Sequence, residues 1–227
     1  MAQSHQHPNA MNYSPPPDNG LTLIYIDEHL LAVDKPAELL SVPGRGEDKQ
    51  DCLARRVQAD YPDAMIVHRL DLPTSGLMLM ARNPTIHSQL GKMFEQRQID
   101  KTYIAIVEGK LEKEQAEIDL PLITDWPNRP RQKVDYESGK PALTRYRLLN
   151  YDADNNCSRV ELKPETGRTH QLRVHMSELG HAILGDRFYA SHDVLNKSNR
   201  LLLHAEQLVF THPVSGELLQ LTAPAPF

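Results

Sequence analysis

Two apolar runs separated by a polar insert constrain the fold of this chain more than any other feature. The runs are residues 65–67 (MIV) and 77–81 (LMLMA), and residues 68–76 (HRLDLPTSG) lie between them. A continuous apolar run of this kind is typical of a strand that is buried on both faces. The polar insert is therefore expected to be a loop held against the core, where its charged side chains face a restricted environment.

The remaining pattern predicts many strands and few helices. Strands are expected at residues 21–25, 30–33, 101–108, 142–151, 159–163, 201–210 and 217–221. Helices are expected at residues 51–61, after the N-cap Asn83 with Pro84 in the first turn, and at residues 169–179 before Gly180. Because strands outnumber helices and do not alternate with them regularly, we predict an α+β fold with a mixed, largely antiparallel central sheet and flanking helices and loops.

The domain organisation is expected to be simple. Residues 1–20 are polar and proline-rich, lack the features of a signal peptide and predict a flexible tail, followed by one catalytic domain at residues 21–227. No apolar stretch reaches the roughly 18 residues of a membrane span, so no membrane association is expected. The two cysteines, Cys52 and Cys157, have neither a metal-binding nor a disulfide pattern, which predicts a cytoplasmic protein.

Positive charge is localised although the net charge is −5. Residues 128–147 carry six basic side chains and two acidic ones, whereas residues 108–125 carry two basic side chains and six acidic ones. The basic stretch follows a proline-rich loop at residues 125–133 (DWPNRPRQK), which contains the only tryptophan. This distribution is compatible with a groove for nucleic acid and also with an ordinary solvated face.

Asp71 is the first candidate for chemistry. A carboxylate pinned between buried strands, with Arg69 two residues away, can act as a nucleophile or base if a cation keeps it ionised. The alternative is a structural aspartate that caps a turn through Thr74 and Ser75. Tyr103, alone in a predicted strand, has no local feature that distinguishes it from an ordinary core tyrosine.

The second candidate is the segment 167–175 (GRTHQLRVH). A glycine leading into a helix with arginines resembles an anion site, and ordinary helix solvation is the alternative. The helix is expected to bury a stripe made of Leu172, Met176 and Leu179, which places His170 and Arg173 together on another side. Arg173 could then reach inward to a carboxylate.

Other common chemistries are not supported by motifs. The histidines of this region do not have the spacing of zinc proteases, and no metal site is expected. No glycine-rich phosphate loop and no Gly-x-Ser-x-Gly elbow occurs, which removes the common nucleotide-binding and serine-hydrolase interpretations.

Residues 68–76 resemble the signature of the RluA family of pseudouridine synthases. Further segments in register resemble other motifs of the family: residues 34–36 (DKP), 40–44 (LSVPG), 167–176 (GRTHQLRVHM), 185–186 (GD), 201–205 (LLLHA) and 212–213 (HP). The resemblance spans residues 21–227 and implies the pseudouridine synthase fold, with a catalytic cleft across the sheet and no separate RNA-binding domain. The chain departs from the pattern at Glu38, where glycine is common, and at Ala182, where His-Pro is common.

The resemblance also implies roles for individual residues. Asp71 matches the catalytic aspartate, Tyr103 the active-site tyrosine and Arg173 the arginine that pairs with the aspartate. Arg69 matches the residue that enters the RNA stack when the target base leaves it. A basic groove that includes Arg129, Arg131 and Lys133 is expected to hold phosphates of the RNA. Substrate binding is also expected to involve His68, Arg168 and His170.

The implied reaction isomerises uridine to pseudouridine in RNA. It gains no atoms and involves no redox change, so no cofactor is expected. Residues 125–130 and 185–190 most resemble members with dual specificity, which act on uridine 746 of 23S ribosomal RNA and uridine 32 of the tRNA anticodon stem-loop. The sequence leaves three routes open for Asp71: attack at C1′, attack at C6, or removal of a ribose proton. A monomer is expected, and the rival functions are a non-catalytic RNA-binding module and a metal-dependent hydrolase using His68, His170 and His175.

Overall fold

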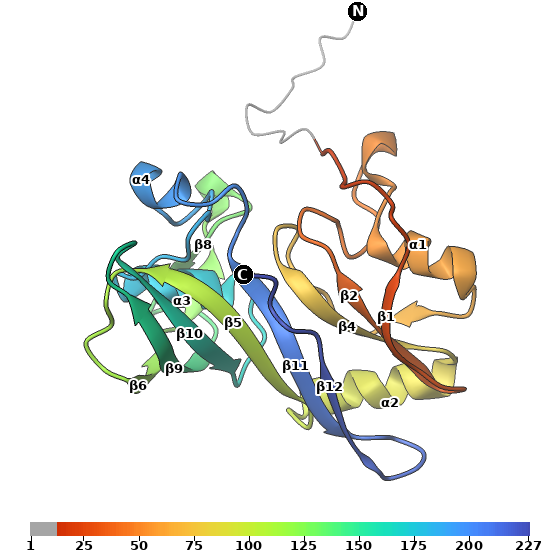
Figure 1. The fold of residues 1–227 in the computed structure, drawn as a ribbon. Coiled ribbons are helices and arrows are strands. Elements are labelled where there is room, and N and C mark those ends of the chain that lie inside the picture. The colour runs from red at the N-terminus through yellow and green to blue at the C-terminus, as the bar shows by residue number, and fades with distance from the viewer. Residues whose placement is uncertain (1–12) are drawn as a thin grey trace, which may run out of the picture.

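The computed structural model describes residues 13–227, which form one large sheet, a small hairpin and short helices (Figure 1). The strands of the large sheet are β1 (Thr22–Ile26), β2 (Leu30–Lys35), β3 (Met65–Ile66), β4 (Ser75–Ala81), β5 (Asp100–Glu108), β6 (Gln115–Asp119), β9 (Leu143–Asp152), β10 (Cys157–Pro164), β11 (Leu203–Thr211) and β12 (Leu218–Thr222). The hairpin consists of β7 (Leu122–Thr124) and β8 (Gln132–Val134). The helices are α1 (Leu53–Asp60), α2 (Pro84–Glu95), α3 (Gln171–Glu178) and α4 (His192–Leu195), with 3₁₀ turns at Glu47–Lys49 and Trp126–Asn128.

The ten-stranded sheet follows the order β1-β2-β4-β11-β5-β10-β9-β6, with β3 paired to β4 and β12 paired to β11. Among the strands of the described residues, the pairing of β11 with β4 is parallel and the others are antiparallel. The predicted α+β class with a mixed, largely antiparallel sheet is therefore confirmed. The expected strands and longer helices are present within a few residues of their predicted bounds, whereas β6, β7, β8 and α4 were not predicted.

The burial of strand β4 explains why polar residues do not alternate with the apolar residues 77–81. All seven of its residues are buried. Leu77 and Leu79 face the core cluster that includes Leu90 of α2, whereas Met78 and Met80 face the cluster that includes Leu53 of α1. The expectation of a strand buried on both faces is confirmed for residues 77–81, whereas residues 65–67 are half-buried.

Local capping sets the start of two helices. The side chain of Asn83 accepts a hydrogen bond of 2.9 Å from the amide of Ile86, so α2 begins as predicted. The helix α3 begins at Gln171 and not at Thr169, because His170 has a left-handed backbone with φ of 55°. Its predicted stripe is confirmed for Leu172 and Met176, which are buried. The prediction is wrong for Leu179, which follows the end of the helix and is 38% exposed.

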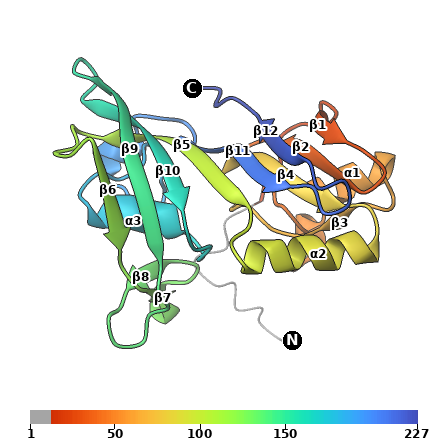
Figure 2. The same cartoon turned by 90° about the horizontal axis from the view of Figure 1, so that it is seen from below.

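The two halves of the sheet meet where β4 lies beside β11. Figures 1 and 2 show β1, β2, β4, α1 and α2 on one side, and β5, β6, β9, β10 and α3 on the other. In the parallel pairing, Ser75 lies opposite His204 and Gly76 opposite Ala205. Gly76 has φ of 115°, and a Cβ atom at this position would lie 2.3 Å from the carbonyl oxygen of Ala205. Only glycine permits this close approach.

Part of the expected N-terminal tail contacts the domain. The hydroxyl of Tyr13 donates to the carbonyl of Asp51 at 2.9 Å, and Arg56 of α1 donates to the carbonyl of Pro16 at 2.7 Å. Residues 1–12 of the expected tail lie outside the described residues. No helix within residues 13–227 combines the length and the apolar character that crossing a membrane would require.

Candidate active site

A cavity of about 1030 Å³ is lined by residues from both halves of the sheet. One half contributes residues 68–74 and 40–42, and the other contributes residues 164–173 and 185–188, apart from Asp186. Seven of the predicted site residues line it: His68, Arg69, Asp71, Tyr103, Arg168, His170 and Arg173. The cavity lies at the upper end of the size range of small-molecule sites, so it can admit a nucleoside.

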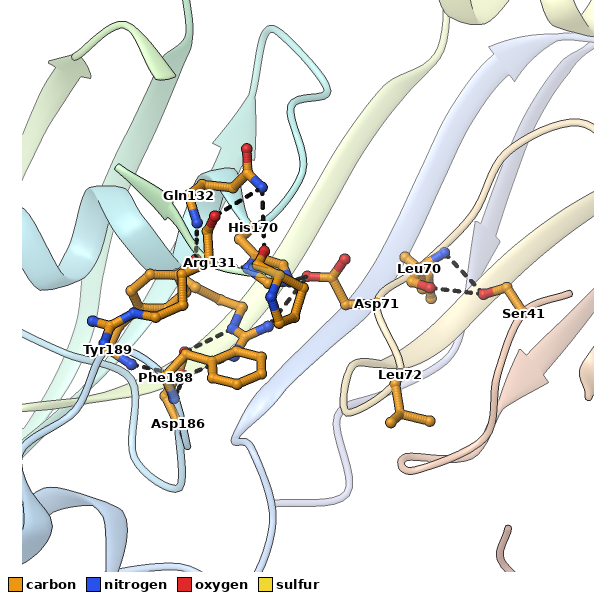
Figure 3. Close-up of polar contacts among 12 residues, drawn as sticks. Ser41, Leu70, Asp71, Leu72, Arg131, Gln132, His170, Asp186, Phe188 and Tyr189 are labelled. Atoms are coloured by element: carbon orange, nitrogen blue, oxygen red, sulfur yellow. Dashed lines mark hydrogen bonds and ion pairs between the residues drawn. The ribbon is translucent and has the colours of Figure 1, made fainter. Parts of the chain in front are cut away.

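Backbone contacts on both sides of Asp71 fix the loop that carries it. The Ser41 hydroxyl donates to the carbonyl of Leu70 at 2.7 Å and accepts from its amide at 3.1 Å (Figure 3). The buried ammonium of Lys35 donates to the carbonyl of Leu72 at 3.2 Å. The amide of Thr74 donates to the backbone carbonyl of Asp71 at 3.1 Å, so the turn is closed by the backbone of Asp71. Its carboxylate, which lines the cavity, is left to face Arg173 and His170.

Lys35 is a buried side chain whose amino group bonds to two segments of the chain. It also donates to the carbonyls of Pro36 and Leu39, at 3.0 and 2.7 Å. Burial lowers the pKa of Lys35 to about 7, against the opposing effect of Asp71. The ammonium thus joins the chain after β2 to the loop that carries the candidate nucleophile.

Arg173 brings a guanidinium from α3 to Asp71. Its Nη1 atom lies 3.6 Å from Oδ2 of Asp71, which agrees with the predicted facing of these side chains. Its closest partner is Asp186, which accepts from Nε and Nη2 at 2.7 Å each. Burial acts against the charge of Arg173, but Asp186 and Asp71 together raise its pKa. Nη1 is buried and has no hydrogen-bond partner among the described residues, so it is free to serve Asp71 or a substrate atom.

His170 approaches the same carboxylate oxygen from the start of α3. Its Nε2 lies 3.8 Å from Oδ2 of Asp71, and its Nδ1 lies 2.6 Å from the hydroxyl of Tyr189 (Figure 3). The Tyr189 hydroxyl accepts a 2.8 Å bond from the amide of Gln132 in β8, so its own proton is available to His170. Burial lowers the pKa of His170 and raises that of Tyr189 to about 12. A neutral His170 that accepts at Nδ1 carries its proton on Nε2, toward Asp71.

Tyr103 in β5 lines the same cavity as the Asp71 carboxylate. Burial, followed by the charge of Asp71, raises the pKa of Tyr103, so its hydroxyl stays protonated at neutral pH. The tyrosine that the local sequence could not distinguish from a core residue therefore lies in the candidate site.

The other residues expected to bind RNA are placed differently. Arg69 is exposed at the cavity, and Arg168, also exposed, donates to the carbonyl of Pro141 at 3.1 Å. His68 stacks on Phe94 with 4.5 Å between ring centroids, and its Nε2 accepts from the amide of Leu79 at 2.9 Å. The main contacts of His68 are thus within the protein.

The basic loop lies beside the cavity and not within it. Pro130 lines the cavity, whereas Arg129, Arg131 and Lys133 do not. Arg129 lies over the ring of Trp126, and Arg131 over that of Tyr189. The positive charge of the segment therefore lies on the loop that contributes Pro130 to the cavity.

Two further findings concern the rival metal-dependent hydrolase and a departure from the motif. Within residues 13–227, no three histidine, cysteine, aspartate or glutamate side chains gather as metal ligands. His175, which the hydrolase alternative requires, faces Thr144 and the carbonyl of Leu120. Glu38 has a left-handed backbone with φ of 62°, a conformation that favours glycine, and forms a 3.1 Å ion pair with Arg187.

The arrangement can perform covalent or general-base chemistry on a nucleoside. A carboxylate faces a cavity, a guanidinium held by Asp186 lies 3.6 Å from it, and a protonated phenol lines the same cavity. These features suit an enzyme site that uses a carboxylate on a substrate of nucleoside size.

Comparisons with known proteins agree with this geometry. Residues 29–178 match the family model described as RNA pseudouridylate synthase. The chain is 52% identical over 216 residues to the dual-specificity RNA pseudouridine synthase RluA of Escherichia coli (strain K12), covering 95% of this chain and 98% of that protein. It is 48% identical over 220 residues to the protein of the same name from Vibrio parahaemolyticus, covering 96% and 88% of the two chains. The chain therefore belongs to the RNA pseudouridylate synthase family.

Solved structures show the same fold. Human RNA pseudouridylate synthase domain containing 1 superposes with a TM-score of 0.79 and 29% identity, covering 94% of this chain and 87% of that one. Human RNA pseudouridylate synthase domain containing 4 superposes with a TM-score of 0.69 and 26% identity, covering 90% and 88%. This protein is thus an RNA pseudouridine synthase, an isomerase that acts on uridine in RNA.

Three residues that organise the site received no role from the sequence. Lys35, Asp186 and Tyr189 lie within motifs that resemble the family, but nothing in their spacing indicates which atoms they contact. The resemblance at residues 34–36 and 185–190 was the only available signal.

Proposed function

We propose that Asp71 is the catalytic group, that Tyr103 and Arg173 complete the active site, and that the RNA targets are 23S ribosomal RNA and tRNA. The observation that carries the assignment is the carboxylate of Asp71 facing the cavity within 4 Å of two nitrogen atoms, Arg173 Nη1 at 3.6 Å and His170 Nε2 at 3.8 Å. Both distances exceed those of strong hydrogen bonds, so neither group occupies the carboxylate, which lines the cavity and remains available for reaction.

The reaction breaks the bond between ribose C1′ and N1 of uracil and forms a bond between C1′ and C5. The C5 proton leaves and N1 gains a proton, so atoms and electrons balance without a cofactor. Asp71 attacks C1′, attacks C6, or removes a ribose proton. Arg173 compensates the negative charge of Asp71. Tyr103 stacks on the uracil and assists removal of the C5 proton.

The target uridine must leave its helix or loop to enter the cavity, which costs a few kcal/mol of unstacking. Arg69, exposed beside Asp71, fills the vacated place in the stack and offsets part of this cost. Arg168, His170 and His68 contact the extruded nucleotide from the cavity wall, and Arg129, Arg131 and Lys133 bind phosphates next to it.

The proposed targets within these RNAs are uridine 746 of 23S ribosomal RNA and uridine 32 of the tRNA anticodon stem-loop. The similarity over nearly the whole length of the dual-specificity relative supports this choice. Both RNAs belong to the translation machinery, which places the proposed activity in the cytoplasm, and the enzyme is proposed to act as a monomer. Mapping of pseudouridines in ribosomal and transfer RNA, from cells with and without the protein, tests the targets.

The catalytic assignment is tested by replacing Asp71 with asparagine, which preserves shape but removes the charge. Asp71→Asn is expected to abolish tritium release from RNA labelled at uracil C5, while RNA affinity stays within about threefold, since base readout and phosphate contacts do not require the carboxylate. Asp193→Asn, at a side chain that is 99% exposed, serves as a control. Turnover by Asp71→Asn at the rate of the control would contradict the assignment.

A further inference from the structure

Trp126 is exposed on the turn between β7 and β8. Its exposed fraction is 64%, and the guanidinium carbon of Arg129 lies 4.3 Å from the centroid of its ring. Tryptophan is highly buried on average, so an indole presented to solvent and covered on one face by a guanidinium requires an explanation. Nothing in the reaction described above uses this side chain.

The turn that carries Trp126 is already ordered. The amide of Asp125 donates to the carbonyl of Arg131 at 2.9 Å, and the amide of Arg131 donates to the carbonyl of Asn128 at 3.0 Å. The side chain of Asn128 donates to the carboxylate of Asp125 at 2.8 Å. A ligand that binds Trp126 therefore loses little affinity to the ordering of the loop.

The same turn is joined to the active site. Pro130 lines the cavity, and the amide of Gln132 bonds to the Tyr189 hydroxyl that contacts His170 (Figure 3). Arg131 and Lys133 add positive charge along this path. An RNA strand that places a uridine in the cavity and leaves past Pro130 thus approaches a loop that carries these cations and the exposed indole.

We propose that Trp126 and Arg129 form a stacking platform, a second nucleobase site that receives an unpaired base of the RNA other than the target uridine. Every base offers a flat π face, and aromatic rings and guanidinium planes are the surfaces on which unstacked RNA bases are received. Arg129 adds a cation–π contact to the indole and positive charge near the strand. The platform selects RNA with a second unstacked base at a fixed distance from the target.

The first experiment uses the fact that Trp126 is the only tryptophan in the chain. The full chain is titrated with the tRNA anticodon stem-loop and with a stem-loop carrying the 23S target, while tryptophan emission and turnover are recorded. A base stacked on the indole is expected to change the emission intensity saturably, with the same dissociation constant as RNA binding. Unchanged emission at saturation with an RNA that the enzyme modifies would overturn the proposal.

The second experiment compares variants of Trp126. Trp126→Ala and Trp126→Leu are expected to weaken RNA binding about 5- to 150-fold, the range that follows from the loss of one base–aromatic stack. Trp126→Phe keeps an aromatic face and should retain most of the affinity. Because the side chain is exposed, these variants should unfold at the temperature of the wild type. Leu218→Ala, at an exposed residue of β12, is the control. Equal affinity of Trp126→Ala and wild type, or of Trp126→Leu and Trp126→Phe, would overturn the stacking role.

A third measurement identifies the base. Single abasic positions are introduced into the loop of the modified RNA, and binding to wild type and Trp126→Ala is compared. At one position other than the target, an abasic site should weaken binding to the wild type about as much as Trp126→Ala does. The same abasic site should not weaken binding to Trp126→Ala further. Additive effects at every position would refute the platform.

This inference rests on the proposed targets only for the choice of stem-loops. Absent turnover on one of them refutes that target, whereas unchanged emission on an RNA that is turned over refutes the platform, so the two failures are distinguishable.

Discussion

Replacing Asp186 with asparagine tests how the guanidinium of Arg173 is positioned. Oδ1 of Asp186 accepts from Nη2 of Arg173 at 2.7 Å and from the amides of Phe188 and Tyr189 at 2.9 and 3.2 Å. Oδ2 accepts from Nε of Arg173 at 2.7 Å. The carboxylate is 1% exposed and the arginine 2%, so both charges are removed from water.

The magnitude follows from these contacts. An asparagine oxygen in the place of Oδ1 keeps three hydrogen bonds, but its NH₂ group then faces the N–H of Arg173 Nε, so one charge-assisted bond is lost and two donors meet. Removal of one partner of a buried ion pair costs about 3–5 kcal/mol. Because three bonds survive and Asp71 remains near Nη1, we expect Asp186→Asn to lower the free energy of unfolding by about 3 kcal/mol.

Urea unfolding followed by circular dichroism measures this change as a fall in the transition midpoint of about 1 M. The single-turnover rate, measured under conditions where the variant is folded, should also fall because Nη1 is no longer held toward Asp71. Asp193→Asn removes an exposed carboxylate and should change stability by less than about 0.5 kcal/mol. A loss in Asp186→Asn no larger than in this control, or an unchanged turnover rate, would refute the reasoning.

Two further predictions concern the histidines of the site. Tyr189→Phe removes the hydroxyl that fixes His170, and should lower the single-turnover rate by up to about tenfold. RNA affinity should not change, since Tyr189 does not line the cavity. A rate equal to that of the wild type would exclude the proposed orientation of His170. Burial lowers the pKa of His68 from 6.5 to about 3, so unfolding takes up a proton between these values and the free energy of unfolding falls as the pH falls through this window. His68→Gln, whose side-chain oxygen can accept from Leu79, should remove part of this dependence between pH 7 and pH 4.5, and identical slopes in urea unfolding would contradict the assignment.

The sequence predicted the parts of the fold that depend on local patterns. A continuous apolar run placed β4, and the capping residues placed α2, because these signals lie within a few residues of one another. The strands β7 and β8 have three residues each and flank a proline-rich turn, so no periodicity could reveal them. The strand β6 has a charged sequence (QAEID) at the edge of the sheet, where only pairing to β9 defines it.

The sequence indicated seven residues that line the cavity, but it did not indicate their contacts. The spacing on α3 placed His170 and Arg173 together, and the structure brings both to the oxygen of one carboxylate that lies about a hundred residues earlier in the chain. The segment after α3 folds back on the helix. This arrangement pairs Arg173 mainly with Asp186 and places Tyr189 where it fixes His170. Such contacts arise from tertiary packing and leave no periodic trace in the sequence.

The separation between Asp71 and Arg173 is determined by the junction of the two halves of the sheet. Asp71 precedes β4, whereas Arg173 lies in α3, which packs on the half that contains β5 and β10. The halves are joined by the short parallel pairing of β4 with β11, and a Cβ at Gly76 would overlap the backbone of Ala205 there. Any side chain at this position would push the two strands apart, and the 3.6 Å contact across the cavity would lengthen with them. The absence of a side chain at Gly76 therefore helps to keep the carboxylate beside its counter-ion, because it permits the close approach of β4 and β11.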